Sequence, residues 1–351
     1  MRILHAPKNI AGQASMISRA QRRRGLTSDV LVFDQNRYNF DCDINIRLSK
    51  YPGLLRPLVK LYYFLRVVRN YDLFHFHYGT SLLPKNLDLY FFAVFGRYVG
   101  KRTIMEYWGS DVIQSDLAKQ FTLIPEVTLR AISPSLDAKK RKRIGRINSL
   151  VDQSIVGDYS LLPFSPGSLV VRQALNHKSI PYVGAGTNER PIKVVHAPTN
   201  RDIKGTSHIL SAIEVLKAEG LPLELILVEN RTHDDAMKIY ETAEIVVDDV
   251  LQGPYGIFAM ECMAIGKPVL GRIDPQLAHY YPGLPIVSTT PDNLEANLRS
   301  LAVDSEKRRK LGEQGREYVE NNHDADIIAG QLVELYESTF HPSSIHDPGG
   351  N

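Results

Sequence analysis

The 351-residue chain has few cysteines and no long apolar run. Its two cysteines, Cys42 and Cys262, lie far apart, which excludes a disulfide framework or a metal site built on a cysteine cluster. The first residues lack the apolar stretch of a secretory signal, and no run reaches the roughly 18–20 apolar residues of a membrane-spanning helix. We therefore expect a cytoplasmic protein, at most peripheral on the inner face of a membrane.

The length and the distribution of charge both favour two domains. A chain of 351 residues is too long for one typical hydrophobic core. The net charge of +3 hides an asymmetry, because residues 1–165 carry +12 and residues 166–351 carry −9. A basic half beside an acidic half indicates two domains with different partners, and the basic half can face a membrane, a nucleic acid or an anionic substrate.

Short apolar segments alternate with helical patterns along the chain, which predicts α/β architecture with mostly parallel sheets. A stretch rich in Pro, Ser and Gly, residues 161–168, reads as the connection between domains. The predicted strands are 2–6, 28–33, 72–79, 102–109, 153–158, 192–199, 223–230, 244–251 and 267–272. The predicted helices are 12–25, 56–70, 205–220, 234–243, 257–265 and 306–338.

These elements predict two Rossmann-like, doubly wound domains that face each other across a cleft. Residues 1–165 form the first domain and residues 166–322 the second; a helix over 323–339 packs back toward the first domain. Residues 340–351 read as a disordered tail. Ligands of such sheets bind at the carboxyl ends of the strands, so we expect functional residues just after strands.

One candidate site follows the strand that begins the second domain. In "HAPTNRDIKGTSH", residues 196–208, Arg201 and Lys204 lie between this strand and a helix that begins near Gly205. Two cations beside the free N–H groups of a helix N-terminus suit a diphosphate. Two solvated loop cations would give the same pattern.

Glu261 is a carboxylate in the middle of "GPYGIFAMECMAIGKPVL", residues 253–270. The segment from Ile257 to Ile265 is apolar on every helical face, so Glu261 should be buried and needs hydrogen-bond donors. Either a cation elsewhere, such as Arg201 or Lys267, or the two hydroxyls of a ribose can supply them.

These two motifs together resemble the nucleotide-sugar-binding domain of retaining GT-B glycosyltransferases of the group 1, or family 4, type. The resemblance implies that Lys204 and Arg201 act on the donor diphosphate and that Glu261 binds its ribose. It also places backbone amides near Gly205, Tyr255 and Gly256 close to the donor. The family's Glu-x7-Glu motif has its second Glu at Glu261, but its first falls on Gly253, with Asp248 and Asp249 just upstream. This departure puts the identity of the transferred sugar in doubt.

The first half supplies further candidates. "NIAGQASMISRA", residues 9–20, resembles the family's glycine loop, with Gly12 as the residue of close approach. His75 and His77 point to one face of their strand and are candidate acceptor contacts or structural residues. Trp108 and Asp111 follow another strand, where Trp108 can stack on a sugar ring or simply pack.

Basic runs at residues 22–24 and 139–146, with the aromatic and basic helix 56–70, account for the charge of the first half. A basic amphipathic surface can dock on anionic lipid, although a solvated helix face has the same composition. No nucleic-acid-binding module is recognisable, so we expect no nucleic acid partner.

The resemblance implies a retaining hexosyltransferase that uses no metal or other cofactor. Its substrates would be a UDP- or GDP-linked sugar and a glycan or lipid-linked acceptor. It predicts that Lys204→Ala costs turnover far more than stability. The alternatives are a non-catalytic nucleotide- or glycan-binding relative, which the missing acid at position 253 favours, and a nucleotide-sugar epimerase.

Overall fold

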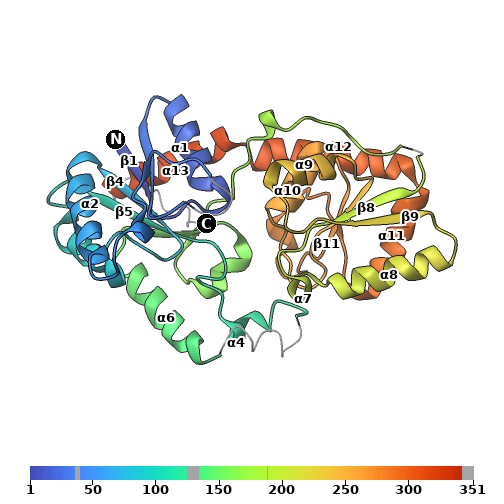
Figure 1. Cartoon of the computed structure of the whole chain (residues 1–351), viewed down its shortest axis with the longest axis horizontal. Coiled ribbons are helices and arrows are strands. Elements are labelled where there is room, and N and C mark those ends of the chain that lie inside the picture. The colour runs from blue at the N-terminus through green and yellow to red at the C-terminus, as the bar shows by residue number, and fades with distance from the viewer. Residues whose placement is uncertain (36–39, 125–133, 188, 342–351) are drawn as a thin grey trace, which may run out of the picture. The chain divides into compact units, whose positions relative to one another are not determined.

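The computed structural model describes residues 1–35, 40–124, 134–187 and 189–341. The described residues fall into two compact units (Figure 1). The first takes in Met1–Gln114, Ser135–Ala174 and the chain from Ala325 onward; the second takes in Leu175–Asp324 and the described part of Ser115–Pro134. The predicted tail lies outside the described residues from position 342.

The first unit contains a seven-stranded sheet in the order β3-β2-β1-β4-β5-β6-β7. All its neighbouring strands run parallel. The order reverses between β1 and β4, a switch point at which sheets of this kind bind ligands. The strands are β1 (Arg2–Ala6), β2 (Thr27–Val32), β3 (Ile44–Asn45), β4 (Leu73–His77), β5 (Arg102–Tyr107), β6 (Gln153–Val156) and β7 (Leu169–Val170).

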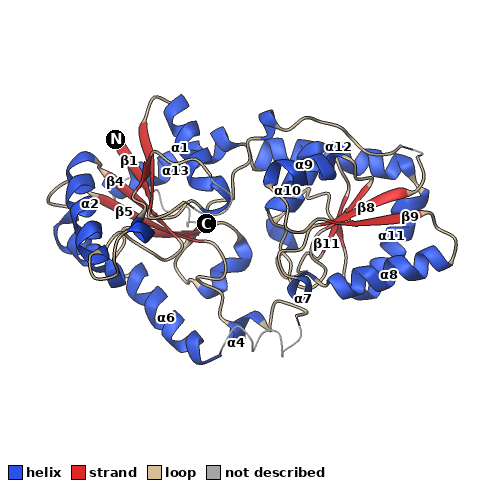
Figure 2. Cartoon of the chain, viewed as in Figure 1, coloured by secondary structure: helices blue, strands red, loops and turns tan. Residues whose placement is uncertain are grey.

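Helices cover both faces of this sheet (Figure 2). The helices are α1 (Gln13–Arg23), α2 (Arg56–Asn70), α3 (Leu87–Phe91) with a π-helical continuation (Phe92–Gly96), α6 (Pro134–Asn148) and α13 (Ala325–Phe340). Short 3₁₀ helices in this unit are Ile10–Gly12, Leu48–Lys50, Pro84–Asn86 and Tyr159–Phe164.

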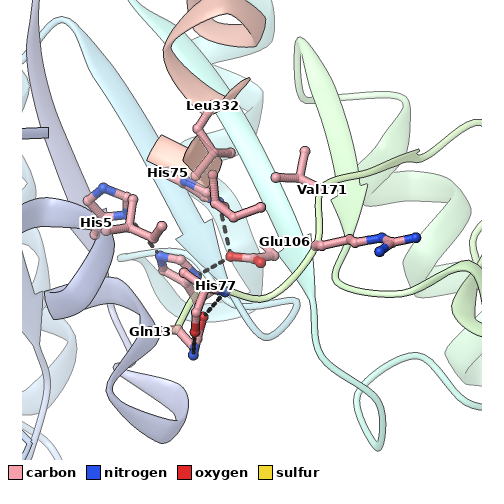
Figure 3. A pocket seen from close by; sticks show the side chains of 11 residues that line it. His5, Gln13, His75, His77, Glu106, Val171 and Leu332 are labelled. Atoms are coloured by element: carbon pink, nitrogen blue, oxygen red, sulfur yellow. Dashed lines mark hydrogen bonds and ion pairs between the residues drawn. The ribbon is translucent and has the colours of Figure 1, made fainter. Parts of the chain in front are cut away.

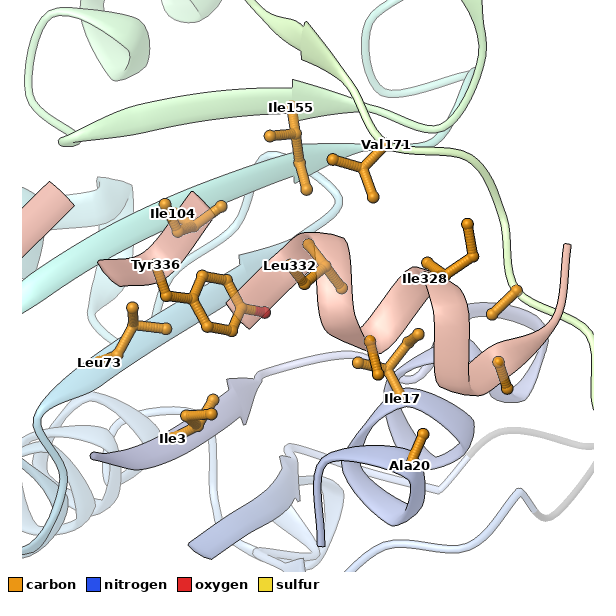
Figure 4. Packing of buried hydrophobic residues seen from close by; sticks show 13 residues of the cluster. Ile3, Ile17, Ala20, Leu73, Ile104, Ile155, Val171, Ile328, Leu332 and Tyr336 are labelled. Carbon is orange, nitrogen blue, oxygen red and sulfur yellow. The ribbon is translucent and has the colours of Figure 1, made fainter. Parts of the chain in front are cut away.

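The C-terminal helix α13 completes the core of the first unit. Its residues Ile328, Leu332 and Tyr336 pack over apolar residues from four strands and from α1 (Figure 4). The strand residues in this cluster are Ile3, Leu73, Ile104 and Ile155. The unit therefore contains the last described helix, and the sequence predicted a helix in this region that returns toward the first half.

The second unit contains a five-stranded parallel sheet in the order β12-β11-β10-β8-β9. Its switch point lies between β8 and β10. The strands are β8 (Ile192–His196), β9 (Leu223–Leu227), β10 (Ile245–Val247), β11 (Val269–Gly271) and β12 (Val287–Ser288). The helices are α4 (Ser115–Ala118), α7 (Arg201–Lys204), α8 (Thr206–Ala218), α9 (His233–Glu241), α10 (Ile257–Ile265), α11 (Leu294–Val303) and α12 (Ser305–Asn322). Its 3₁₀ helices are His177–Ser179, Ala278–Tyr280 and Pro291–Asn293.

The two parallel sheets confirm the predicted fold class of two Rossmann-like, doubly wound units. The change of unit falls after Ala174, whereas the sequence placed it after residue 165. The reason is β7, because Leu169 and Val170 extend the first sheet by pairing with β6. No helix in the described part of the chain combines the length and the apolarity needed to cross a membrane.

Helix α10, which carries Glu261, is fixed by close packing against α12. A Cβ atom at Gly312 of α12 would overlap the carbonyl oxygen of Gly266, which follows α10. At Gly315, one turn further along, a Cβ atom would lie 3.1 Å from the side chain of Met263. Glycine at position 312 therefore lets the two helix backbones approach closely.

We expect Gly312→Ala to lower the free energy of unfolding by about 1–3 kcal/mol, because the added methyl group must push α12 away from α10. Urea unfolding measures this loss. The matched control is Gly145→Ala in α6, where a Cβ atom meets no other atom. The control should be neutral or stabilising, since alanine favours an exposed helix interior. Equal stability of the two variants would contradict the packing argument.

Candidate functional site

Lys204 lies at the switch point of the second sheet, where β8 and β10 end. Its Nζ atom is 2.9 Å from Asp248 Oδ1 and 3.6 Å from Asp249 Oδ2. Burial by itself would lower the pKa of Lys204, but the two carboxylates raise it above its ordinary value. Lys204 is therefore a permanently charged ammonium that joins the loop after β8 to the loop after β10.

Asp248 and Asp249 have different roles in this arrangement. Asp249 Oδ1 accepts the backbone N–H groups of Leu251 and Gln252, so Asp249 caps the turn that follows β10. Asp248 is buried, and its Oδ2 atom has no hydrogen-bond partner among the described residues. Burial raises the pKa of Asp249, and Lys204 opposes this increase. Asp249 thus stabilises the turn after β10, and Asp248 is the closer ion-pair partner of Lys204.

Arg201 has a carboxylate partner of its own. Its guanidinium makes two hydrogen bonds to Glu229, of 2.8 and 2.6 Å, from a half-exposed position on the surface. The Asn200 side chain caps the short helix α7 by accepting the N–H groups of Asp202 and Ile203. Both predicted diphosphate ligands therefore belong to one capped helix, and each is bound to acidic side chains in the structure.

Gly205 separates α7 from α8 with a φ of 76°. A Cβ atom here would lie 2.5 Å from Val250 Cγ2 and 3.0 Å from Leu251 Cγ. Glycine is therefore required for the loop after β10 to approach the start of α8. Donor binding at Gly205 stays a prediction.

Glu261 is buried in α10, as the apolar pattern predicted, with 7% of its surface exposed. Its Oε1 atom lies 2.7 Å from Nε2 of His233, the first residue of α9. The two cations named from the sequence have other partners, because Arg201 binds Glu229 and Lys267 donates to the carbonyl oxygen of Gly184. The sequence reasoning missed His233, whose one signal is its position after Thr232, which caps the N-terminus of α9.

The loop before α10 holds Tyr255 and Gly256. The Tyr255 hydroxyl lies 2.9 Å from His323 Nε2 and 3.3 Å from the Tyr318 hydroxyl, and its ring packs edge-on against Tyr281. Gly256 is the N-cap of α10, and a Cβ atom there meets nothing within 4 Å. The structure therefore gives Tyr255 a packing role and leaves the amino end of α10 uncrowded.

Gly253, which stands where the resembling family has a glutamate, is enclosed by backbone. Its φ is +46°, and a Cβ atom would lie 2.7 Å from the carbonyl oxygen of Arg272. The Arg272 guanidinium donates to the carbonyl oxygens of Gln252 and Phe121 and pairs with Asp274. A glutamate therefore does not fit at position 253 in this conformation, and an arginine lies beside that position.

In the first unit, Gly12 precedes α1 with a φ of 74°, and a Cβ atom would lie 3.0 Å from the Phe40 ring. A pocket lies beside this loop at the carboxyl ends of β1 and β2. Its lining includes Lys8, Asn9, Asp34 and Phe40. The predicted glycine loop thus borders a pocket with a mixed polar and apolar lining at this edge of the first sheet.

His75 and His77 lie on one face of β4, as predicted, but both rings are buried. His5 lies opposite His75 on β1, and Glu106 lies opposite His77 on β5. Glu106 Oε2 is 2.9 Å from His77 Nδ1 and 3.3 Å from His75 Nε2 (Figure 3). The rings therefore contact protein groups, and their role as acceptor contacts stays a prediction.

Burial disfavours the charged form of two of these histidines, His5 and His75. Burial lowers the pKa of His75 to about 4 and that of His5 well below its ordinary value. The ring nitrogens of His5, His75 and His77 lie within 4.8 Å of one another, a spacing that metal ligands also have. However, the rings of His75 and His77 are stacked, and they already contact Glu106 and the hydroxyl of Tyr336. The free volume beside them is about 10 Å³, roughly the space of one water molecule.

Asp111 forms a tight turn after β5. Its Oδ1 atom accepts the N–H groups of Trp108 and Gly109, at 3.0 and 2.9 Å. Its Oδ2 atom is buried without a hydrogen-bond partner in the described structure, as is Nε1 of Trp108. Burial raises the pKa of Asp111. These buried polar atoms, together with Arg143, which donates to the Asp111 carbonyl oxygen, make this strand end a candidate binding site.

The two units have the fold of GT-B glycosyltransferases. Over 98% of this chain and the whole of the other, the structure matches a sucrose-phosphate synthase from Thermosynechococcus elongatus with a TM-score of 0.64 and 17% identity. It matches Anabaena HepE in complex with UDP with a TM-score of 0.61 and 12% identity, over 96% of this chain and the whole of HepE. A putative UDP-N-acetylglucosamine 2-epimerase from Listeria monocytogenes matches with a TM-score of 0.55 and 12% identity, over 99% of this chain and 98% of that chain.

Comparison of sequences gives a partial match. The chain is 31% identical over 117 residues to an uncharacterised glycosyltransferase of Methanocaldococcus jannaschii. The match covers 30% of this chain and 28% of that protein, so the chain spans less than a third of its relative. No family model matches the sequence.

The expected loss of turnover in Lys204→Ala stays a prediction, and the geometry adds an effect on stability. Removing the ammonium leaves the buried carboxylates of Asp248 and Asp249 without their cation. We expect Lys204→Met to lower the free energy of unfolding by about 3 kcal/mol, measured in urea. Adding Asp248→Asn removes one of the two charges, so the double variant should recover part of this loss. A single variant as stable as the unchanged protein would contradict the pairing.

The His233–Glu261 pair predicts a pH dependence of stability. The hydrogen bond that the His233 ring donates to Glu261 raises the pKa of His233 above its ordinary value of 6.5, although burial opposes this. A raised folded-state pKa stabilises the protein fully below 6.5, and this contribution is lost as the pH rises through the folded-state value. The difference in unfolding free energy between the unchanged protein and His233→Gln should therefore shrink as the pH rises above 6.5.

Chemical denaturation at a series of pH values measures that difference, and NMR titration of the His233 ring reports its pKa directly. His208→Gln is the control, since His208 is an exposed histidine on α8. A pKa of His233 at or below 6.5 would overturn the assignment.

Proposed function

We propose that the chain is a glycosyltransferase that transfers a hexosyl unit from a nucleotide diphosphate sugar to a glycan or lipid-linked acceptor. The observation that carries the proposal is Glu261, a buried carboxylate in an otherwise apolar helix, whose partner His233 is half-exposed. A half-exposed partner leaves this carboxylate within reach of a ligand. A ribose diol offers two hydroxyl donors to such a group.

The names of the structural neighbours support UDP as the nucleotide. HepE has been solved with UDP and with UDP-glucose, and both structures share the fold of this chain. Under the proposal, the ribose of the uridine moiety binds Glu261. The uncrowded amino end of α10, at Gly256, then faces the donor. A helix N-terminus favours the negative charge of a diphosphate.

Lys204 and Arg201 are proposed to stabilise the leaving diphosphate. Preformed positive charge is most effective where negative charge grows in the transition state. Asp248 and Asp249 keep Lys204 protonated, so the ammonium is available at any working pH. Donor binding then requires the diphosphate to share this ammonium with Asp248. Retention of configuration, and transfer without a metal, are part of the proposal and follow from the resemblance to the family 4 type.

On the acceptor side, Asp111 is proposed to accept a hydrogen bond from a sugar hydroxyl. Its buried Oδ2 atom has no partner among the described residues, and a ligand hydroxyl would satisfy it. Trp108, which precedes it, would offer an aromatic face and an indole N–H. Under the proposal, His75 and His77 also take part in the acceptor site, through their network with Glu106.

Two other functions have specific support. A structural neighbour is a putative nucleotide-sugar 2-epimerase, which favours a reaction on the donor alone. The glycine at position 253, which excludes a glutamate there, favours a non-catalytic nucleotide-binding relative. The three functions differ in what happens to a donor with and without an acceptor.

Calorimetric titration with UDP tests the role of Glu261. We expect Glu261→Gln to weaken UDP binding by about tenfold or more, because a charged acceptor of two hydroxyl groups is lost. Glu214→Gln, on the exposed side of α8, is the matched control and should bind like the unchanged protein. Equal affinity of the two variants would remove Glu261 from the site.

NMR of UDP-glucose, incubated with and without a panel of glycan acceptors, then separates the three functions. The proposed transferase consumes the donor with an acceptor and releases UDP. Conversion of the intact donor without any acceptor would establish the epimerase. Binding of UDP without conversion of any sugar donor, UDP- or GDP-linked, would establish the non-catalytic relative.

A further inference from the structure

Exposed apolar side chains are concentrated in one segment of the first unit. Among the described residues, 23 large apolar side chains are exposed, and 13 of them lie between Tyr51 and Val99. Leu54 is 92% exposed and Tyr98 is 89% exposed. Monomeric proteins rarely expose large contiguous apolar patches, so this concentration indicates an interaction surface.

Helix α2 is apolar on two sides. Phe64 and Val67 are buried and attach the helix to the unit. Leu58, Leu61, Tyr62 and Leu65 are spaced at 3, 4 and 7 residues, which places them on one helical face. All four are exposed. The helix therefore shows the apolar spacing of a buried face on a side that no described residue covers.

A second apolar stripe lies on α3, its π-helical continuation and the turn that follows. Leu87, Tyr90, Val94 and Tyr98 follow one another at intervals of three or four residues, and all are exposed. This segment packs beside α2, since the Phe64 ring lies 5.6 Å from that of Phe91 and 5.9 Å from that of Phe92. We call the exposed residues of both stripes the α2–α3 surface.

Positive charge surrounds the α2–α3 surface. Residues 46–101 contain nine Lys and Arg residues and two acidic residues. Both acids are engaged elsewhere, because Asp72 pairs with Arg2 and buried Asp88 accepts hydrogen bonds from Ser81 and Leu82. The exposed basic residues are Arg47, Lys50, Arg56, Arg66, Arg69, Lys85 and Arg97. Leucine and tyrosine flanked by cations match the interface of an anionic membrane.

Several cations of the basic runs at residues 22–24 and 139–146 make contacts within the unit. Arg22 pairs with Asp29 and Asp43, and Arg23 pairs with Asp326. In α6, Lys140 donates to the carbonyl oxygens of Ser110 and Ile113, and Arg143 donates to that of Asp111. The α2–α3 surface combines a larger set of exposed apolar residues with its exposed cations.

We propose that the α2–α3 surface binds the protein to an anionic lipid bilayer, with the leucine and tyrosine side chains inserted between headgroups and the basic residues on the anionic phosphates. The proposed membrane attachment depends only on the α2–α3 surface and not on the proposed enzymatic function. Its consequence for substrate choice, a lipid-linked acceptor held at the membrane, rests on the proposed glycosyltransferase function.

Vesicle co-sedimentation of the full chain tests the proposal. We expect binding to phosphatidylcholine vesicles that contain about 30 mol% phosphatidylglycerol and much weaker binding to phosphatidylcholine alone. The double variant Leu58→Glu with Leu65→Glu should weaken binding to the anionic vesicles about tenfold or more, because two inserted side chains become acidic. Arg66→Glu with Arg69→Glu should weaken it too, and added salt should reduce binding of the unchanged protein.

The matched control is Leu210→Glu with Val215→Glu on α8, two residues that are each 39% exposed. It should bind vesicles like the unchanged protein. Thermal melting of each variant shows whether the fold is intact, and UDP titration shows whether the proposed nucleotide site is intact. A failure of the membrane proposal can therefore be told apart from a failure of the proposed function. Equal vesicle binding by all variants, or no binding to anionic vesicles, would overturn the proposal. A dimer in light scattering that Leu58→Glu with Leu65→Glu converts to monomer, without vesicle binding, would assign the surface to a second copy instead.

Discussion

The pairing of buried charges at the carboxyl edge of the second sheet is the interaction on which the site depends. A buried unpaired charge costs several kcal/mol, so each acid here requires a cation or a set of N–H donors. Lys204 meets Asp248 and Asp249, and Arg272 meets Asp274. The Lys204 pairs join the loops after β8 and β10, and the hydrogen bond from Arg272 to the carbonyl oxygen of Gln252 joins the loops after β10 and β11.

The close approach of these loops requires glycine at two positions of the site. Gly205 accommodates Val250 and Leu251, and Gly253 lies against the carbonyl oxygen of Arg272. The glycine at position 253 therefore changes the backbone packing as well as removing an acidic group. It accompanies an arginine whose guanidinium would lie 3.3 Å from a Cβ atom there. The local charge is thus opposite to that of the Glu-x7-Glu pattern, although Asp274 and two carbonyl oxygens already bind this arginine.

Much of the fold could be predicted from periodicity and strand composition. The strand Arg2–Ala6 and the helices Arg56–Asn70 and Ile257–Ile265 have the bounds that the sequence predicted. The two-residue strands β3, β7 and β12 could not be predicted, since two residues show no alternation. Missing β7 placed the domain border nine residues too early.

The site was less predictable than the fold because its contacts join distant segments. The burial of Glu261 followed from the apolar residues around it, but its partner did not. His233 reaches Glu261 only because α9 packs beside α10, and no local pattern encodes that contact. In the same way, the loop cations Arg201 and Lys204 could be recognised as a pair, whereas the acids that bind them lie 28 and 44 residues further along the chain.

Net charge was a poor guide to the surface for a related reason. The total of +12 does not tell which cations of the first half are exposed and which make hydrogen bonds or ion pairs within the unit, as Arg22, Arg23 and Lys140 do. A cation that is held against groups of its own unit is less available to an external partner than a fully exposed one. The charge that acts outward is that of exposed residues such as Arg66 and Arg69. An exposed apolar stripe beside them is a stronger indication of a lipid partner than the total charge, since it costs free energy in water unless something covers it.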